Sequence, residues 1–135
     1  MDQLKRDRLV AELSVKHEPQ LVRIEVFFDG NDDLGSIGCN LIRHPGIEAA
    51  RATFARLSAR DDVEAIYAQI SDLDPGEDSW PFTDTVLVFG SISPEQLAEE
   101  VAALEPDEVG SAEEFGITYP AISEQPSRAL VAWWD

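Results

Sequence analysis

TVLVFGSISPEQLAEEVAAL, residues 85–104, joins a continuous apolar run to the clearest helix start in the chain. The apolar run predicts a central strand covered on both faces, because a half-exposed strand would alternate apolar and polar residues. Ser93 then stands at the N-cap, Pro94 at the first helical position and Gln96 three residues after the cap, which predicts a capping box. The stretch therefore predicts a buried strand followed at once by a helix that ends near Leu104.

Further elements lie on both sides of this stretch. HPGIEAARATFARLSAR (44–60) predicts a helix, because its apolar residues recur at spacings of three, four and three: Ile47, Ala50, Phe54 and Leu57. VEAIYAQI (63–70) predicts a strand, and RALVAWW (128–134) predicts a last strand, apolar enough to be internal. Residues 105–127 contain several prolines and glycines and are expected to be irregular.

The first third of the chain shows period-two patterns. LVRIEVFFD (21–29) alternates firmly and predicts a strand, and SIGCNLI (36–42) predicts its hairpin partner. RLVAELSVK (8–16) also alternates and predicts a strand, with a helix that starts after Asp2 as the alternative. From residue 36 onward the order is β-α-β-β-α-β, the split βαβ order of ferredoxin-like domains.

The sequence therefore predicts a single α+β domain over residues 1–135. Its expected sheet has five or six strands, mixed but mainly antiparallel, with two helices on one face and an N-terminal hairpin added to the ferredoxin-like order. The hydrophobic fraction of 44% is sufficient for a core of this kind.

The net charge of −17 is unevenly distributed along the chain. Residues 1–60 hold nine acidic and nine basic residues, whereas residues 61–127 hold seventeen acidic residues and no Lys or Arg. Such a field repels nucleic acid and anionic membranes and attracts basic proteins. The alternative is that the acidity serves only solubility.

The same sequence carries cues to location. No apolar run approaches the roughly 20 residues of a membrane-spanning helix, and the first residues lack the apolar centre of a signal peptide. The single Cys39 cannot form an internal disulfide, which suits a reducing compartment. We expect a cytoplasmic protein without a membrane partner.

DGNDDLGSIGCN (29–40) is the first candidate for chemistry. As an EF-hand it fails, because the sixth position is Leu34 rather than Gly and the twelfth is Asn40 rather than Glu. A looser site for a divalent cation such as Ca²⁺ or Mg²⁺ would use three carboxylates of this loop: Asp29, Asp32 and Asp33. The favoured alternative is a polar turn whose side chains bond their own backbone. No other cofactor is predicted.

Nucleophilic catalysis finds little support in the sequence. Cys39 would need His44 or His17 beside it, and the favoured interpretation is a small hydrophobic side chain in a buried strand. No serine lies in a nucleophile elbow, and no glycine-rich phosphate loop carries a lysine. The sequence favours a protein that is not an enzyme.

The acidic stretch SDLDPGEDSWPFTD (71–84), which is predicted to be a loop, carries the functional hypothesis. Its aromatic residues are either binding anchors or a plug over the core. The leading hypothesis is a non-enzymatic interaction module, similar to an inhibitor or an immunity protein, that binds a basic partner. The expected contact residues are Asp72, Asp74, Glu77, Asp78 and Trp80. The alternative is a metal-dependent enzyme or ligand-binding domain that uses the 29–33 carboxylates.

Overall fold

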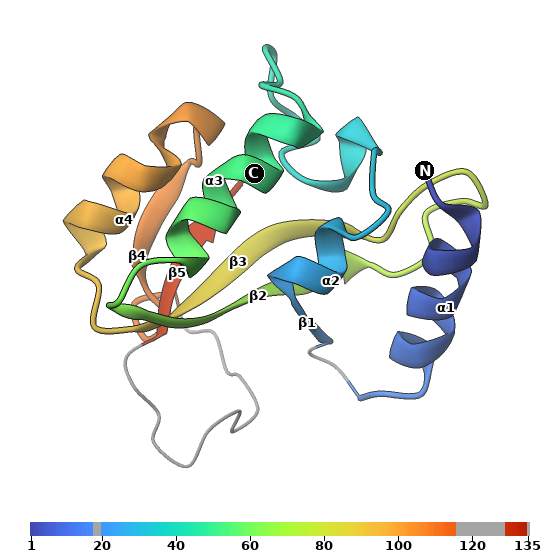
Figure 1. Ribbon diagram of the computed structural model, residues 1–135, viewed down its shortest axis with the longest axis horizontal. Helices are drawn as coiled ribbons and strands as arrows, with labels where there is room; N and C mark the ends of the chain where they lie inside the picture. The colour runs from blue at the N-terminus through green and yellow to red at the C-terminus, as the bar shows by residue number, and fades with distance from the viewer. Residues whose placement is uncertain (18–19, 116–128, 135) are drawn as a thin grey trace.

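The computed structural model describes residues 1–17, 20–115 and 129–134. Five strands form one sheet in the order β1-β2-β3-β5-β4, and each neighbouring pair is antiparallel (Figure 1). The strands are β1 (Leu21–Arg23), β2 (Val63–Asp72), β3 (Phe82–Gly90), β4 (Glu108–Ser111) and β5 (Ala129–Trp133). The predicted α+β class with a mainly antiparallel, five-stranded sheet is confirmed.

Three helices cover one face of this sheet, and a fourth lies at its end. The helices are α1 (Gln3–Ser14), α2 (Ile24–Phe28), α3 (Ile47–Ser58) and α4 (Pro94–Val101), with 3-10 turns η1 (Leu34–Ser36) and η2 (Ala102–Leu104). In Figure 1, α3 lies between α4 and α2 on one side of the sheet, while α1 lies at the end beside the N-terminus. The two expected helices, α3 and α4, therefore share a face, and α2 joins them. Among the described helices, none has the length and apolarity needed to cross a membrane.

The strand and helix expected from residues 85–104 are both present. Val86, Leu87 and Val88 are completely buried, and β3 pairs with β2 on one edge and β5 on the other. The Ser93 hydroxyl accepts the N–H of Gln96 at 3.1 Å, while the Gln96 side chain accepts the N–H of Ser93 at 3.4 Å. The capping box is therefore formed, with Pro94 in the first turn.

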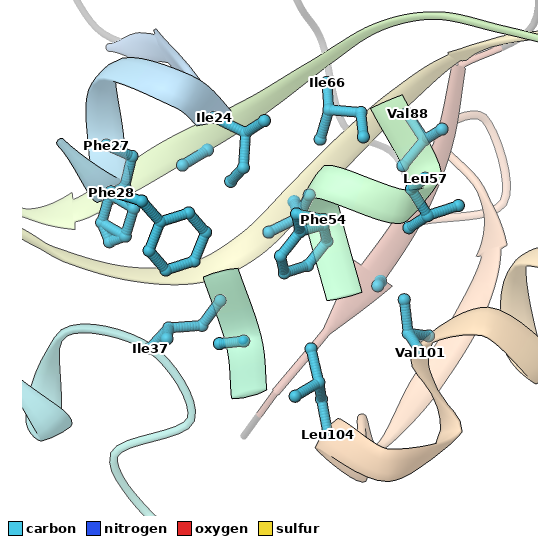
Figure 2. Close-up of a cluster of buried hydrophobic side chains, with 14 of the residues drawn as sticks. Ile24, Phe27, Phe28, Ile37, Phe54, Leu57, Ile66, Val88, Val101 and Leu104 are labelled. Atoms are coloured by element: carbon cyan, nitrogen blue, oxygen red, sulfur yellow. The ribbon is translucent and has the colours of Figure 1, made fainter. Parts of the chain in front are cut away.

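The main core lies between the sheet and the helices (Figure 2). The strand register aligns apolar side chains in rows across β2, β3 and β5: Ile66 with Val88 and Leu130, and Ala68 with Val86 and Ala132. The Phe28 ring of α2 stacks on the Phe54 ring of α3 with centroids 6.0 Å apart. This contact packs α2 against α3 above the sheet.

Residues 8–16, expected as a strand, instead belong to α1, which is the alternative that begins after Asp2. The Asp2 side chain accepts the N–H of Lys5 at 3.2 Å and caps the helix. Leu9 and Leu13 are buried, whereas Val15 is 83% exposed. A spacing of four residues satisfies both a period of two and a period of 3.6, so the alternation did not distinguish strand from helix.

Residues 21–29 and 36–42 do not form the expected hairpin. Only Leu21–Arg23 is a strand, and the following residues turn into α2, because a helix lets the consecutive Phe27 and Phe28 both reach the core. Residues 36–42 form no strand, apart from one isolated bridge between Ile37 and Thr83. Since the strand that would begin the ferredoxin-like order is missing, that order is not confirmed.

Gly90 is the last residue of β3 and has a backbone conformation that favours glycine. Its φ is +148°, and an added Cβ would lie 2.2 Å from the carbonyl oxygen of Asp62. That oxygen cannot retreat freely, because it accepts the N–H groups of Ser91 and Ile92. Gly90→Ala should therefore lower the free energy of unfolding by about 2–4 kcal/mol, measured by urea denaturation. Gly76→Ala is the control, since the nearest atom to its added Cβ lies 3.8 Å away, and a comparable loss there would contradict the explanation.

Candidate functional site

The two acidic segments of the chain meet in the structure. Asp33 bridges them: one carboxylate oxygen accepts the N–H of Gly35 at 3.0 Å, and the other accepts the N–H of Trp80 at 2.9 Å. The first segment, residues 29–36, is called the acidic turn below, and the second, residues 71–80, the acidic loop. Their convergence depends on a contact between residues far apart in sequence.

The carboxylates of the acidic turn are engaged by separate partners. Asp29 accepts from the Lys5 ammonium at 2.6 Å, and this hydrogen bond raises the pKa of Lys5. Asp32 pairs with the N-terminal ammonium at 2.7 Å, and Asp33 accepts backbone N–H groups as described. Within the described residues, no three His, Cys, Asp or Glu side chains gather as metal ligands. Asp29, Asp32 and Asp33 are thus bound to three different partners, and Asp33 bonds the backbone of its own turn.

Asn31 forms the centre of the acidic turn and is buried. Its amide nitrogen donates to the Ser36 hydroxyl at 2.9 Å and to the carbonyl of Phe27 at 3.3 Å, and its oxygen accepts the N–H of Asp33 at 2.9 Å. The surrounding bonds make it a structural residue, which fits the preference of Asn for turns.

Arg6 fastens the acidic loop to α1. Its guanidinium donates to the carbonyls of Ser79 at 3.0 Å and Gly76 at 2.7 Å, and it forms an ion pair with Asp74. The Arg6 side chain is only 7% exposed. Burial alone would lower its pKa, but the hydrogen bonds to Asp74 and Asp7 outweigh burial and raise it. A cation of the first half of the chain therefore compensates the acidic loop from within.

These contacts divide the expected contact residues into two groups. Asp72, Glu77 and Asp78 are exposed and keep their side chains at the surface. Asp74 is occupied by Arg6, and Trp80 is 0% exposed. The use of Trp80 as a surface anchor is therefore wrong, because the indole serves as the plug that closes the core beneath the loop.

A second acidic region lies at the other end of the sheet. We call residues 94–111 the α4–β4 end, and Figure 1 shows it on the side opposite α1. Four of its exposed carboxylates form no ion pair with any described residue: Glu95, Glu99, Glu105 and Glu108. Exposed carboxylates therefore gather at two separated ends of the sheet.

Arg60 follows α3 and bonds to Glu100 of α4, next to the α4–β4 end. It makes two bonds to Asp62, at 2.8 and 3.0 Å, and one to Glu100 at 3.2 Å. The hydrogen bond from Arg60 holds the pKa of Asp62 below its ordinary value. This network joins the end of α3 to the start of β2 and to α4.

Cys39 and His44 do not form a catalytic pair. Cys39 is exposed and lies outside any strand, which corrects the expectation of a buried strand residue. His44 accepts the N–H of Gly46 at Nδ1, at 2.9 Å, so its Nε2 carries the proton and donates to the carbonyl of Ile37 at 2.6 Å. Both ring nitrogens are therefore occupied by backbone groups.

Arg6→Met should lower the free energy of unfolding by about 2–4 kcal/mol, because it leaves two carbonyls and Asp74 without their donor. Arg6→Lys should recover only part of this loss, since an ammonium cannot reproduce the fork of the guanidinium. Urea denaturation measures both variants. Arg8→Met, an exposed position on the same helix, is the matched control and should change stability by less than about 0.5 kcal/mol. Equal losses at the two positions would show that Arg6 does not fasten the loop.

Comparison with known proteins places the chain in a family. The family model described as "Uncharacterized protein YfbO family" matches residues 4–131. A relative from Escherichia coli (strain K12), called "Uncharacterized protein YfbO", is 32% identical over 123 residues, which cover 85% of this chain and 82% of the relative. No solved structure matches the chain. The match over nearly the whole length shows that this protein belongs to the YfbO family.

Proposed function

We propose that the protein is a non-enzymatic interaction module, similar in its mode of action to an inhibitor or an immunity protein, and that it binds a basic partner protein. The observation that carries this proposal is the charge of the second half of the chain, which has seventeen acidic residues and no Lys or Arg over residues 61–127. A surface of this sign speeds the encounter with a cationic partner and disfavours acidic competitors.

The contact surface that we propose is the α4–β4 end. There, Glu95 and Glu99 stand one turn apart on the exposed side of α4, and Glu108 begins an edge strand. The acidic loop is the weaker candidate, because Arg6 neutralises Asp74 and the loop is bonded to a helix that also carries Lys5 and Arg8. Exposed carboxylates without a nearby cation produce the stronger field.

Two variants with equal net charge distinguish the two ends. Glu95→Gln/Glu99→Gln/Glu108→Gln removes three charges from the α4–β4 end, and Asp72→Asn/Glu77→Gln/Asp78→Asn removes three from the acidic loop. With a basic partner captured from the native host, the first variant should slow association about tenfold, and the second less than about twofold. Stopped-flow or surface-based kinetics at low and high salt measure the rates.

Equal effects of the two variants would show that net charge, and not the α4–β4 end, determines binding. Binding that is indifferent to salt would remove the electrostatic basis of the proposal, because exposed charges are screened beyond about 10 Å at 0.1 M salt. Capture of acidic or neutral proteins alone would contradict the proposed partner class.

A further inference from the structure

A groove lies between α2 and α3, away from the residues discussed so far as contact sites. It is open to the surface and has a volume of about 740 Å³, and its apolar lining consists of the exposed Val26 and Ala55 and the buried Ile24, Phe28 and Phe54. Figure 2 shows Ile24, Phe28 and Phe54 converging from the two helices. Small-molecule sites in proteins have volumes of about 300–1,000 Å³ and mainly apolar walls with a few polar groups. The groove meets this description in both size and composition.

The charged groups at the groove are already paired. Arg51 donates to the carbonyls of Phe28 at 2.8 Å and Asn31 at 2.6 Å and forms an ion pair with Glu48. Asp29 forms an ion pair with Lys5, and a carboxylate oxygen of Glu25 lies 3.4 Å from the Nε of Arg23. A charged ligand would have to displace one partner of these ion pairs. It would also lose its own hydration when it lies against the apolar lining of the groove. The lining therefore favours an uncharged ligand.

One polar group on the wall lacks a partner. The hydroxyl of Ser58, at the end of α3, is buried and makes no hydrogen bond with any described residue, although Ser58 lines the groove. A buried hydroxyl without a hydrogen bond is costly to the protein, and a ligand that supplies the missing partner binds more tightly and more selectively.

We propose that the groove between α2 and α3 binds an uncharged, largely apolar small molecule whose hydrogen-bonding group pairs with the Ser58 hydroxyl. Rings or branched chains of the ligand would lie against the exposed Val26 and Ala55, over the buried Ile24, Phe28 and Phe54. The proposal does not depend on the basic partner, since no residue of the α4–β4 end lines the groove.

The test uses the full chain and N-phenyl-1-naphthylamine, an uncharged fluorescent probe. The probe should bind with a stoichiometry of one, and the amide resonances that shift on binding should belong to α2 and α3. Three competitors of similar shape then vary the charge: 2-naphthylmethanol, 2-naphthoate and 2-naphthylmethylammonium. The alcohol should displace the probe at concentrations at least tenfold below those of both ions.

Variants on α3 locate the site. Ala55→Trp fills the groove and should weaken probe binding at least tenfold, while Ala52→Trp, exposed on the same helix but outside the lining, should leave it unchanged. If circular dichroism shows that Ala55→Trp does not fold, Ala55→Glu replaces it, because it places a charge at the same position with a smaller side chain and should also weaken probe binding. Ser58→Ala should weaken the alcohol about threefold to tenfold without affecting 2-methylnaphthalene.

Three results would overturn the proposal. They are absence of saturable probe binding to the unmodified protein, displacement by the ions as effective as that by the alcohol, and equal effects of the Ala55 and Ala52 substitutions. An unchanged preference for the alcohol in Ser58→Ala would contradict the assigned hydrogen bond. None of these results bears on the basic partner, so the two proposals can fail separately.

Discussion

Burial of β3 on both faces is the constraint on which the rest of the architecture depends. Val86 and Val88 face the helices, and Leu87 faces the opposite side, yet all three are completely buried. A strand in this position must have hydrogen-bonded neighbours on both edges, which β2 and β5 supply. The shorter strands β1 and β4 are thereby left at the margins, where short strands limit unwanted pairing.

Two arginines of the first half organise the acidic second half. Arg6 fixes the acidic loop to α1, and Arg60 connects Asp62 with Glu100. Each cation neutralises carboxylates at the boundary between elements, where a fixed position matters for packing. Other carboxylates are exposed at the two ends of the sheet, where water screens their mutual repulsion. The uneven charge of the sequence thus becomes an arrangement with structural pairs inside and a negative field outside.

Local signals in the sequence predicted most elements of the second half, although β4 lies in the segment that was expected to be irregular. Ser93, Pro94 and Gln96 defined the start of α4, because a cap is recognised within one turn of chain. The stripe of Ile47, Ala50, Phe54 and Leu57 identified α3, since only a helix brings those spacings to one face. In the first third, the spacing of Leu9 and Leu13 fitted both a strand and a helix. The alternation of residues 21–29 gave no sign that the strand ends at Arg23 and a helix follows. Pattern alone could not separate these possibilities.

The site was less accessible from sequence than the fold. The bonds from Arg6 to Ser79 and from Asp33 to Trp80 join residues far apart in the chain, and no spacing rule anticipates them. The pairing of Asp29 with Lys5 and the burial of Trp80 depend on the same docking. The groove between α2 and α3 was missed because its α2 wall was interpreted as a strand. The exposure of Val26 distinguishes the helix from a strand only in the structure, because in the sequence Val26 fits the alternating pattern of residues 21–29.

The pairing of β3 with both neighbours also bears on the order in which the strands would assemble. β2 and β3 follow one another in the chain, so their hairpin closes a short loop, whereas β5 reaches β3 only after α4 and β4 have been traversed. Loop-closure entropy and the dependence of rate on contact order make the second pairing the slower event. Until β5 docks, one edge of an apolar strand is open to intermolecular contacts. Mutual repulsion between highly negative chains would keep such early species apart while the sheet is completed.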